Sequence, residues 1–302
     1  MSRQIMKVED LGKKQMNRSE VKKAGFEAIS RSQRRIICNL QSTKKSVGKT
    51  RFAFTAPKPI GYISVEIGGE EGAADEFIPA GAESFDGIQI ARVHMATPEY
   101  PDPANFNTST KDGAKEYDSA LSAAVQNAAE PAYAAFFAAY EASLANMRTT
   151  VIDTGTDLYQ LARLANFGRL EKIPQLAYAQ VKREFAKMVD DAFKQPGHNL
   201  VWIHHLKEKG EVTAAGKWQQ NGEYGLDGCS TVLDKVQANI EFWREDLTED
   251  DPETGMRVRF NCSIVDSRHS PLAMGKQFQT LDISFADVAM TILPGTKKED
   301  WQ

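Results

Sequence analysis

Cysteine and long apolar runs are both scarce in this sequence. The chain of 302 residues has three cysteines, Cys38, Cys229 and Cys262, which lie far apart and form no CxxC pair. This spacing excludes a disulfide framework and favours a reducing, cytoplasmic compartment. No apolar run approaches the roughly 20 residues that span a bilayer. The first residues also lack the apolar core of a signal peptide, so we expect no membrane partner.

A surplus of positive charge is missing as well. Lys and Arg total 37 against 41 Asp and Glu, which gives a formal net charge of −4 at pH 7. The charge of the whole chain gives no case for nucleic-acid binding, so any basic surface has to be local. With 41% hydrophobic and 26% charged residues, the composition is that of an ordinary soluble globular protein with one large domain or two small ones.

What the sequence does contain is a short phosphate-binding pattern. Gly48-Lys49-Thr50 ends the P-loop pattern G-x-x-x-x-G-K-[ST], but Thr43 occupies the position of its first glycine. The tripeptide alone is weak evidence, because average composition produces one by chance in about one of ten chains of this length. The interpretation therefore depends on what surrounds the tripeptide.

The surrounding sequence predicts the context that a P-loop needs. Residues 35–40 (RIICNL) form a short β-type run before the loop. Residues 50–56 (TRFAFTA) predict a short helix that Pro57 ends, and residues 60–69 (IGYISVEIGG) predict a second buried strand. The order strand, loop, helix, strand is the one in which this motif binds phosphate.

Strands and helices continue to alternate along the chain. Strands are predicted at 87–95, at 149–153 and from 199 to the pair His204-His205; helices are predicted at 114–147, 157–170 and 173–197. Pro131 predicts a new first turn or a kink within the first of these helices. Residues 230–245 fit a helix or a strand, residues 256–272 predict a strand leading into a basic turn, and the ending 297–302 predicts a disordered tail.

This alternation predicts the fold class: α/β, with three layers and a mostly parallel sheet. We expect a basic N-terminal arm at 1–33, a catalytic domain at 34–280 with an acidic and Ala-rich insertion at 70–147, and a C-terminal strand with an acidic tail at 281–302. The arm is either a solvated segment or a contact for a neighbouring subunit or nucleic acid.

The loop residues have defined roles in phosphate binding. Consecutive backbone N–H groups curl around the phosphates, Gly48 allows close approach, Lys49 reaches the β- and γ-phosphates and Thr50 binds Mg²⁺. The predicted nucleotide-binding residues are Thr43, Lys44, Lys45, Ser46, Val47, Gly48, Lys49, Thr50 and Arg51.

Two acidic residues end predicted strands. Asp153 ends the run TTVID, and phosphoryl-transfer sites need a carboxylate at the tip of a neighbouring strand to hold Mg²⁺ or its water. The alternative is that Asp153 caps the next helix, although Asp157 is better placed to do so. Glu66 ends YISVE and could orient or deprotonate an attacking water; the alternative is a solvated acid in an acidic loop.

The run LVWIHHLK is a further polar strand end. Alternation places the side chains of His204 and His205 on opposite faces, so both cannot bind one metal ion without a distorted strand. One of them could contact a γ-phosphate and report its presence to the next loop. That loop interleaves lysines with aromatic side chains, which suits single-stranded nucleic acid, and the alternative is a polar surface hairpin. The residues concerned are Lys207, Lys209, Lys217, Trp218 and Tyr224.

Together these parts resemble the RecA-like ATPase core, and in detail the phage-encoded RecA-like nucleotide-binding proteins, some of which are single-strand annealing or recombination proteins. The resemblance runs over residues 34–278 and rests on KKSVGKTRFAFTAPKPIGYISVEIGG, VIDTGTDLYQLARLANFGRL, NLVWIHHLKEK and RVRFNCSIVDSRHSPL. It implies an ATP- and Mg²⁺-dependent ATPase that binds single-stranded DNA in recombination, annealing or replication repair. If the chain is phage-encoded, it would act in the host cytoplasm.

The resemblance also implies roles within the nucleotide site. Lys49 and Thr50 hold phosphate and Mg²⁺, Asp153 matches the Walker B aspartate, and Glu66 matches the glutamate that activates water. His205 falls on the glutamine that senses the γ-phosphate, and a histidine can make the same hydrogen bond.

Further roles concern DNA and neighbouring subunits. The resemblance places Arg163, Arg169 and Lys172 near the first DNA-binding loop. Arg268 falls near a basic residue that reaches across a subunit interface to the neighbour's nucleotide, which implies a homo-oligomer, either ring or filament. A single-strand-binding protein is a further expected partner.

Two departures leave the hydrolysis rate open. Thr43 stands at a position that can need a backbone shape that β-branched residues disfavour, although Lys44 and Lys45 could compensate by adding charge. Asp266 stands where RecA has a second interface lysine. The alternatives that remain are a nucleotide-gated single-strand-binding protein with little hydrolysis, a P-loop small-molecule kinase, and a structural protein that keeps only the fold.

Overall fold

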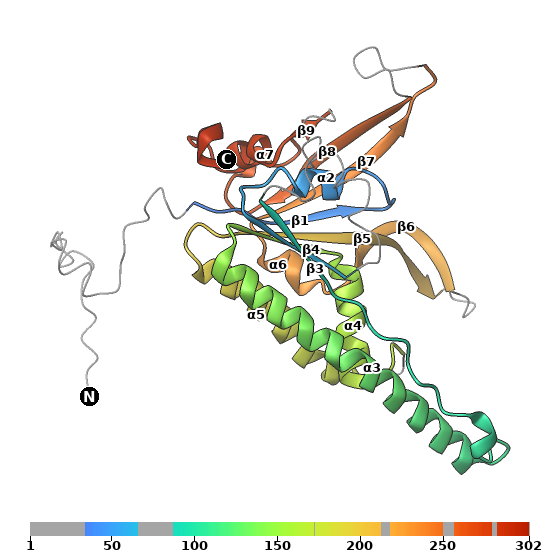
Figure 1. Ribbon diagram of the computed structural model, residues 1–302. Helices are drawn as coiled ribbons and strands as arrows, with labels where there is room; N and C mark the ends of the chain where they lie inside the picture. The colour runs from blue at the N-terminus through green and yellow to red at the C-terminus, as the bar shows by residue number, and fades with distance from the viewer. Residues whose placement is uncertain are drawn as a thin grey trace, which may run out of the picture. The chain divides into compact units, whose positions relative to one another are not determined.

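A nine-stranded sheet forms the centre of the part of the chain described here (Figure 1). The computed structural model describes residues 34–65, 87–171, 173–212, 218–249, 257–279 and 283–301. Predictions for the N-terminal arm at 1–33 and for Glu66, Lys172 and Lys217 lie outside these residues. The elements below all belong to one compact unit, Arg35–Gln302.

The strands of this sheet run mostly parallel. In space their order is β3-β2-β4-β5-β1-β7-β8-β9, with β6 paired to β5 off this path. The first six strands in this spatial order, from β3 to β7, are parallel to one another. Strands β8, β9 and β6 are antiparallel to their neighbours. Their bounds are β1 (Ile37–Ser42), β2 (Ile60–Ser64), β3 (Ile88–Arg92), β4 (Thr149–Asp153), β5 (Asn199–Val212), β6 (Trp218–Asp227), β7 (Ala238–Asp246), β8 (Val258–Ser267) and β9 (Gln277–Phe278).

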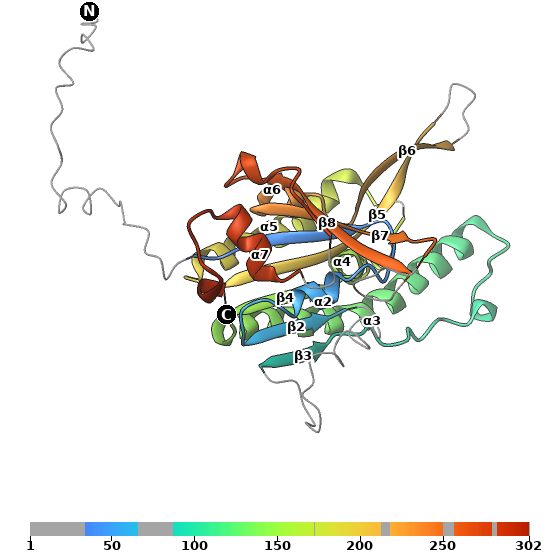
Figure 2. The same ribbon diagram turned by 90° about the horizontal axis from the view of Figure 1, so that it is seen from above.

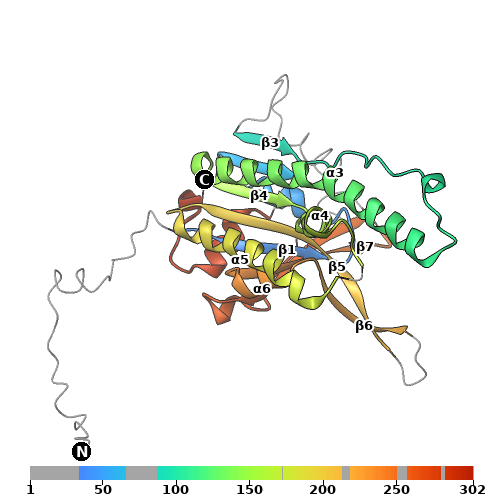
Figure 3. The ribbon, with the colours of Figure 1, turned by 90° about the horizontal axis from the view of Figure 1, so that it is seen from below.

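Helices cover both faces of the sheet. The α-helices are α2 (Lys49–Ala53), α3 (Lys111–Asn146), α4 (Gly155–Phe167), α5 (Tyr178–Lys194), α6 (Thr231–Lys235) and α7 (Phe285–Ile292); the short 3₁₀ helices are η4 (Pro103–Asn105), η5 (Gln175–Ala177), η6 (Pro271–Ala273) and η7 (Lys298–Trp301). Helices α3, α4, α5 and α6 lie on one face, and α2 and α7 lie on the other (Figures 2 and 3). The expected fold class, three-layer α/β with a mostly parallel sheet, is confirmed.

Strand β1 illustrates how the sequence produces these layers. Because successive side chains of a strand point to opposite faces, Ile37 packs with residues of α3, α4 and α5, whereas Cys38 and Leu40 pack with residues of α2 and α7. Both faces are buried, which is why the central strands have near-continuous apolar sequences.

The predicted first helix of the Ala-rich region is one unbroken helix, α3, with Pro131 inside it. Its second half contributes Ala129, Phe136 and Tyr140 to the core, while its first half extends beyond the sheet (Figure 1). The next helix, α4, begins after Thr154, whose hydroxyl accepts from the N–H of Asp157, and ends at Gly168 as expected. Part of the expected insertion is therefore integral to the fold, since α3 lies in a helical layer and β3 is the edge strand of the sheet.

The predicted end of β5 at the histidine pair is wrong. The strand continues to Val212, and from His205 onward it pairs with β6 in an antiparallel hairpin. The region that fitted either a helix or a strand, 230–245, contains both, because α6 ends at Lys235 and β7 begins at Ala238.

The expectations for residues 281–302 are also wrong. Helix α7 stands where a strand was expected, and its apolar side packs Phe285, Val288 and Ile292 against the sheet. The ending is not a disordered tail, because the side chain of Trp301 is 2% exposed and its Nε1 donates to Thr296 Oγ1 at 3.1 Å. The charged composition of this ending predicted disorder, although its one large apolar side chain, Trp301, is buried. No helix in the described residues combines the length and apolarity of a bilayer span.

Candidate functional site

The P-loop links the carboxyl end of β1 to α2, as the sequence predicts. Positive backbone φ angles occur at Ser46 (55°) and at Gly48 (90°), which precedes α2. Thr43, at the position of the first motif glycine, is not among the described residues with positive φ. The concern that its β-branched side chain opposes the loop backbone is therefore not supported, since left-handed strain would arise at Ser46 instead.

Lys49 is held inside this loop. Its side chain is buried, and its ammonium group donates a hydrogen bond to the hydroxyl oxygen of Ser42, the last residue of β1. The Ser42 hydroxyl in turn donates to the backbone oxygen of Lys44 at 2.7 Å. The Lys49 ammonium group, which would bind a phosphate, is therefore already held at the carboxyl end of β1, beside the loop.

Thr50, Asp153 and Tyr62 come together beside the loop. The Thr50 hydroxyl donates to Asp153 Oδ2 at 2.7 Å, and the Tyr62 hydroxyl donates to the same oxygen at 2.7 Å. The two pairs are separated by 103 and 91 residues in sequence. Tyr62 was not among the residues predicted for the site; its signal in the sequence was an aromatic side chain with a hydroxyl group within a mostly apolar strand.

The prediction assumed that the strand carrying Asp153 neighbours β1. In the structure these two strands are not direct neighbours. Strand β5 lies between β1 and β4 and pairs in parallel with both. Asp153 and the loop still meet, because Thr50 reaches from the first turn of α2 toward the carboxyl end of β4. Ligands of open parallel sheets bind at such carboxyl ends.

These oxygen groups fit a Mg²⁺ ion bound together with phosphates. Mg²⁺ in phosphate-transfer sites is held by one or two protein oxygens plus phosphate oxygens and waters. Thr50 gives its proton to Asp153, so the lone pairs of its oxygen are available to a cation. Glu66 lies outside the described residues; Val65 just before it donates its N–H to the backbone oxygen of Asp153 at 2.7 Å.

The two histidines of β5 lie on opposite faces, as predicted. His205 lies opposite Ser42 in the β1–β5 register, and its N–H donates to Thr156 Oγ1 at 3.0 Å. His204 is fully buried on the other face, where its ring stacks on Trp202 with a centroid distance of 5.7 Å.

His204 is held as a neutral ring. Burial, with smaller contributions from the charges of His205 and Lys49, lowers the pKa of His204 from 6.5 to about 3. Its Nδ1 lies 2.6 Å from Asn39 Oδ1, and Asn39 Nδ2 donates to Gln41, so Nδ1 is the donor to Asn39. A Cβ on Gly155 at the start of α4 would come within 2.3 Å of His204 Nε2, so helix and ring are in close contact.

The expected DNA-binding loop after Lys207 is the β5–β6 hairpin. The ammonium of Lys207 lies 2.6 Å from Asp227, and that of Lys209 lies 3.5 Å from Glu223. Tyr224 is 52% exposed, and Trp218 begins β6. Both described lysines of the hairpin are thus paired with carboxylates across the two strands.

The residues predicted near the first DNA-binding loop are also engaged. The Arg163 guanidinium lies over the rings of Tyr159 and Tyr178, at 5.7 and 5.4 Å, and donates to the Tyr178 hydroxyl. Arg169 forms an ion pair with Asp118 of α3 at 3.6 Å.

Arg268 lies near the amino ends of the parallel strands, whereas the P-loop follows the carboxyl end of β1. Arg268 follows β8, whose last residue, Ser267, pairs with Ala238 at the start of β7. Its guanidinium donates to the backbone oxygen of Lys235 at 3.4 Å. The structure does not bring Arg268 to the P-loop of its own chain.

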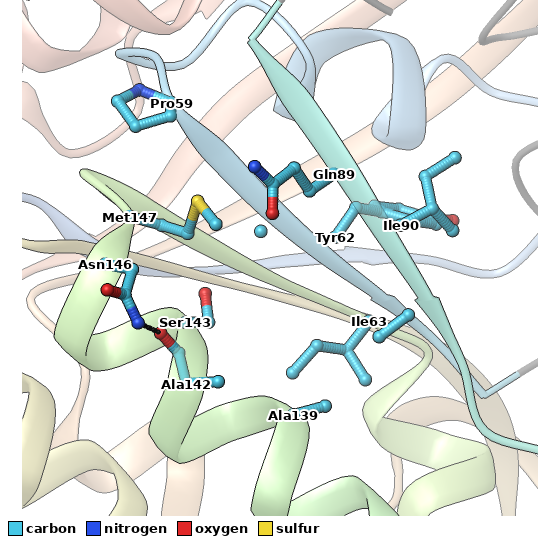
Figure 4. Close-up of a pocket in the computed structure, with 12 residues that line it drawn as sticks. Pro59, Tyr62, Ile63, Gln89, Ile90, Ala139, Ala142, Ser143, Asn146 and Met147 are labelled. Atoms are coloured by element: carbon cyan, nitrogen blue, oxygen red, sulfur yellow. Dashed lines mark hydrogen bonds between the residues drawn. The ribbon is translucent and has the colours of Figure 1, made fainter. Parts of the chain in front are cut away.

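A cavity in the described part of the chain is separate from these residues. It has a volume of about 480 Å³ and lies between β2, β3 and the end of α3, where Ile63, Ala139, Ser143 and Met147 line it (Figure 4). None of the sequence-predicted site residues line it. The P-loop is instead flanked by a small apolar recess whose walls include Gly48, Phe52, Phe242 and Phe260.

Comparisons with known proteins are distant. No protein-family model matches this chain, and no curated protein matches it. Among solved structures, it is similar to the crystal structure of the RadB recombinase, with 11% sequence identity and a TM-score of 0.37, over 80% of this chain and 86% of that one. A likeness this remote carries no information about the site. The mixed α/β architecture, with its mostly parallel sheet between helices, rests on the strand pairing of this chain alone.

Proposed function

We propose that this protein is a RecA-like P-loop ATPase that binds ATP and Mg²⁺ and acts on single-stranded DNA. The observation that carries the proposal is the hydrogen bond between Thr50 Oγ1 and Asp153 Oδ2, at 2.7 Å. It unites the last residue of the loop motif with the strand-end carboxylate that nucleotide chemistry requires. The two residues are far apart in sequence, so nothing local brings them together. Their contact therefore supports a functional motif over a chance occurrence of the tripeptide.

Each residue of the site has a task in this proposal. The loop backbone and the Lys49 ammonium bind the phosphates, and Thr50 and Asp153 hold the metal. Bound Mg²⁺ would neutralise charge on the phosphate oxygens. Glu66 would accept a proton from the attacking water. His205, opposite Ser42 in the sheet, would contact the γ-phosphate.

The continuous strand β5 would connect nucleotide and DNA. It places His205 beside the loop strand and then continues into the hairpin with β6. Between positions 205 and 227 the sequence carries four acidic and three basic residues, so DNA phosphates would compete with Asp227 and Glu223 for the lysines. The exposed ring of Tyr224 would stack on bases.

Assembly into a homo-oligomer would bring Arg268 to a second chain. Because Arg268 lies at the opposite end of the parallel strands from its own P-loop, it would serve a nucleotide held by a neighbouring subunit. Sizing of the protein with and without ATP and single-stranded DNA tests this part separately.

The central test is ATP binding and phosphate release, with and without single-stranded DNA. Lys49→Ala should lower turnover by about 100-fold or more, because it removes a positioned cation from the phosphates. Lys187→Ala, on the exposed face of α5, is the matched control and should leave turnover unchanged. Unchanged turnover in Lys49→Ala would overturn the proposal. Tight binding without release would instead favour a nucleotide-gated binding protein, and consumption only with an acceptor would favour a kinase.

A further inference from the structure

Asp153 receives two hydroxyl hydrogen bonds on a single oxygen. Thr50 donates from α2, on the loop side, and Tyr62 donates from β2, on the other side, both at 2.7 Å from Oδ2. Asp153 itself is nearly inaccessible to solvent. A buried carboxylate that accepts hydrogen bonds from a helix and from a strand has little freedom to rotate.

The Tyr62 hydroxyl is a costly group to place where it is. The side chain is fully buried, and its ring packs against Phe54 with a centroid distance of 5.0 Å. A buried hydroxyl costs free energy unless it is hydrogen-bonded, and phenylalanine would fill the same apolar space without that cost. In the β2–β4 register, Tyr62 lies opposite Val151, so its phenol reaches two residues along β4 to meet Asp153.

Another buried tyrosine, Tyr140, has a hydroxyl whose hydrogen-bond partner lies away from the loop and Asp153. Tyr140 of α3 is as well buried, and its hydroxyl donates to the backbone oxygen of Met188 on α5 at 2.5 Å. That contact joins two helices and lies outside the nucleotide site. The Tyr62 hydroxyl meets the strand-end carboxylate instead.

We propose that Tyr62 is a positioning residue that holds the Asp153 carboxylate for the metal ion of a bound Mg²⁺–nucleotide complex. This inference rests on the proposed function, because it needs a metal-dependent nucleotide site. Groups that orient a metal's carboxylate partner tune the affinity for the metal, and their loss costs about 10- to 100-fold. Tyr62 does not touch the nucleotide phosphates in this proposal, so nucleotide binding without metal does not depend on its hydroxyl.

The test is the Mg²⁺ concentration that half-saturates binding of a fluorescent ATP analogue. Tyr62→Phe should raise this concentration about 10-fold or more, with metal-free nucleotide binding unchanged. Tyr140→Phe also removes one buried hydroxyl with its hydrogen bond, and should leave the Mg²⁺ requirement unchanged. If Tyr62→Phe does not fold, Tyr62→Met keeps an apolar side chain without the hydroxyl and should show the same shift.

The outcomes distinguish a failure of the proposed role of Tyr62 from a failure of the proposed nucleotide site. Metal-dependent binding in the unaltered protein with no shift in Tyr62→Phe overturns the role of Tyr62 and leaves the nucleotide site standing. Equal shifts in Tyr62→Phe and Tyr140→Phe also overturn it, because they would reflect general loosening of the fold. Absence of any nucleotide binding in the unaltered protein overturns the proposed function and this inference with it.

Discussion

Acidification should destabilise this protein through His204. The ring is fully buried, stacked on Trp202 and neutral, with its pKa lowered from 6.5 to about 3. Because the folded pKa lies below the unfolded value, the unfolded chain binds a proton that the folded chain excludes. The stabilisation is fully present above pH 6.5 and is lost as the pH falls toward 3. For one such group, a fall from about pH 7.5 to about pH 5.5 costs about 1.4 kcal/mol.

The assay compares the unaltered protein with His204→Asn by urea unfolding at both pH values. Asparagine is chosen because its Nδ2 can replace the histidine Nδ1 as donor to Asn39. Other titrating groups, including His198, whose pKa burial also lowers, contribute equally to both proteins. The difference in unfolding free energy between the two should therefore shrink by about 1.4 kcal/mol on acidification. A difference that is the same at both pH values would refute the reasoning.

Two further predictions concern the fold. Trp301→Ala should lower the free energy of unfolding by about 3 to 5 kcal/mol, because it empties a buried aromatic site, whereas Lys298→Ala on the exposed side of the same turn should change it little; urea titration checks both. Gly168→Ala should cost on the order of 2 kcal/mol or more, since its φ is 62° and a Cβ would lie 2.0 Å from the Ser122 backbone oxygen. Gly222→Ala shares a positive φ but meets nothing within 4 Å, so thermal unfolding should show a smaller loss; equal losses would contradict the packing argument.

Much of the local structure follows from sequence pattern. The strand before the loop, the short helix stopped near Pro57 and the helix closed at Gly168 all appear where propensity and capping residues predict them. The opposite faces of His204 and His205 follow from strand alternation alone. Such features depend on neighbours within a few residues, so a single sequence is sufficient.

Other features were out of reach of local pattern. The continuation of β5 past the histidine pair depends on pairing with β6, and the burial of Trp301 depends on its packing against Phe285 of α7. Two of the lysines predicted for DNA, Lys207 and Lys209, have carboxylate partners on the facing strand, up to 20 residues away. Composition shows that charges are present but not which of them pair.

The sequence by itself determined the α/β alternation, the P-loop and the presence of a carboxylate at the end of TTVID. Only the tertiary structure decided that β5 separates β1 from β4, that Thr50 and Asp153 nevertheless meet, and that Tyr62 completes their contact. The physical reason is that periodicity and propensity act over a few residues. Which strands pair, and therefore which side chains share a carboxylate, is settled by packing between segments about a hundred residues apart.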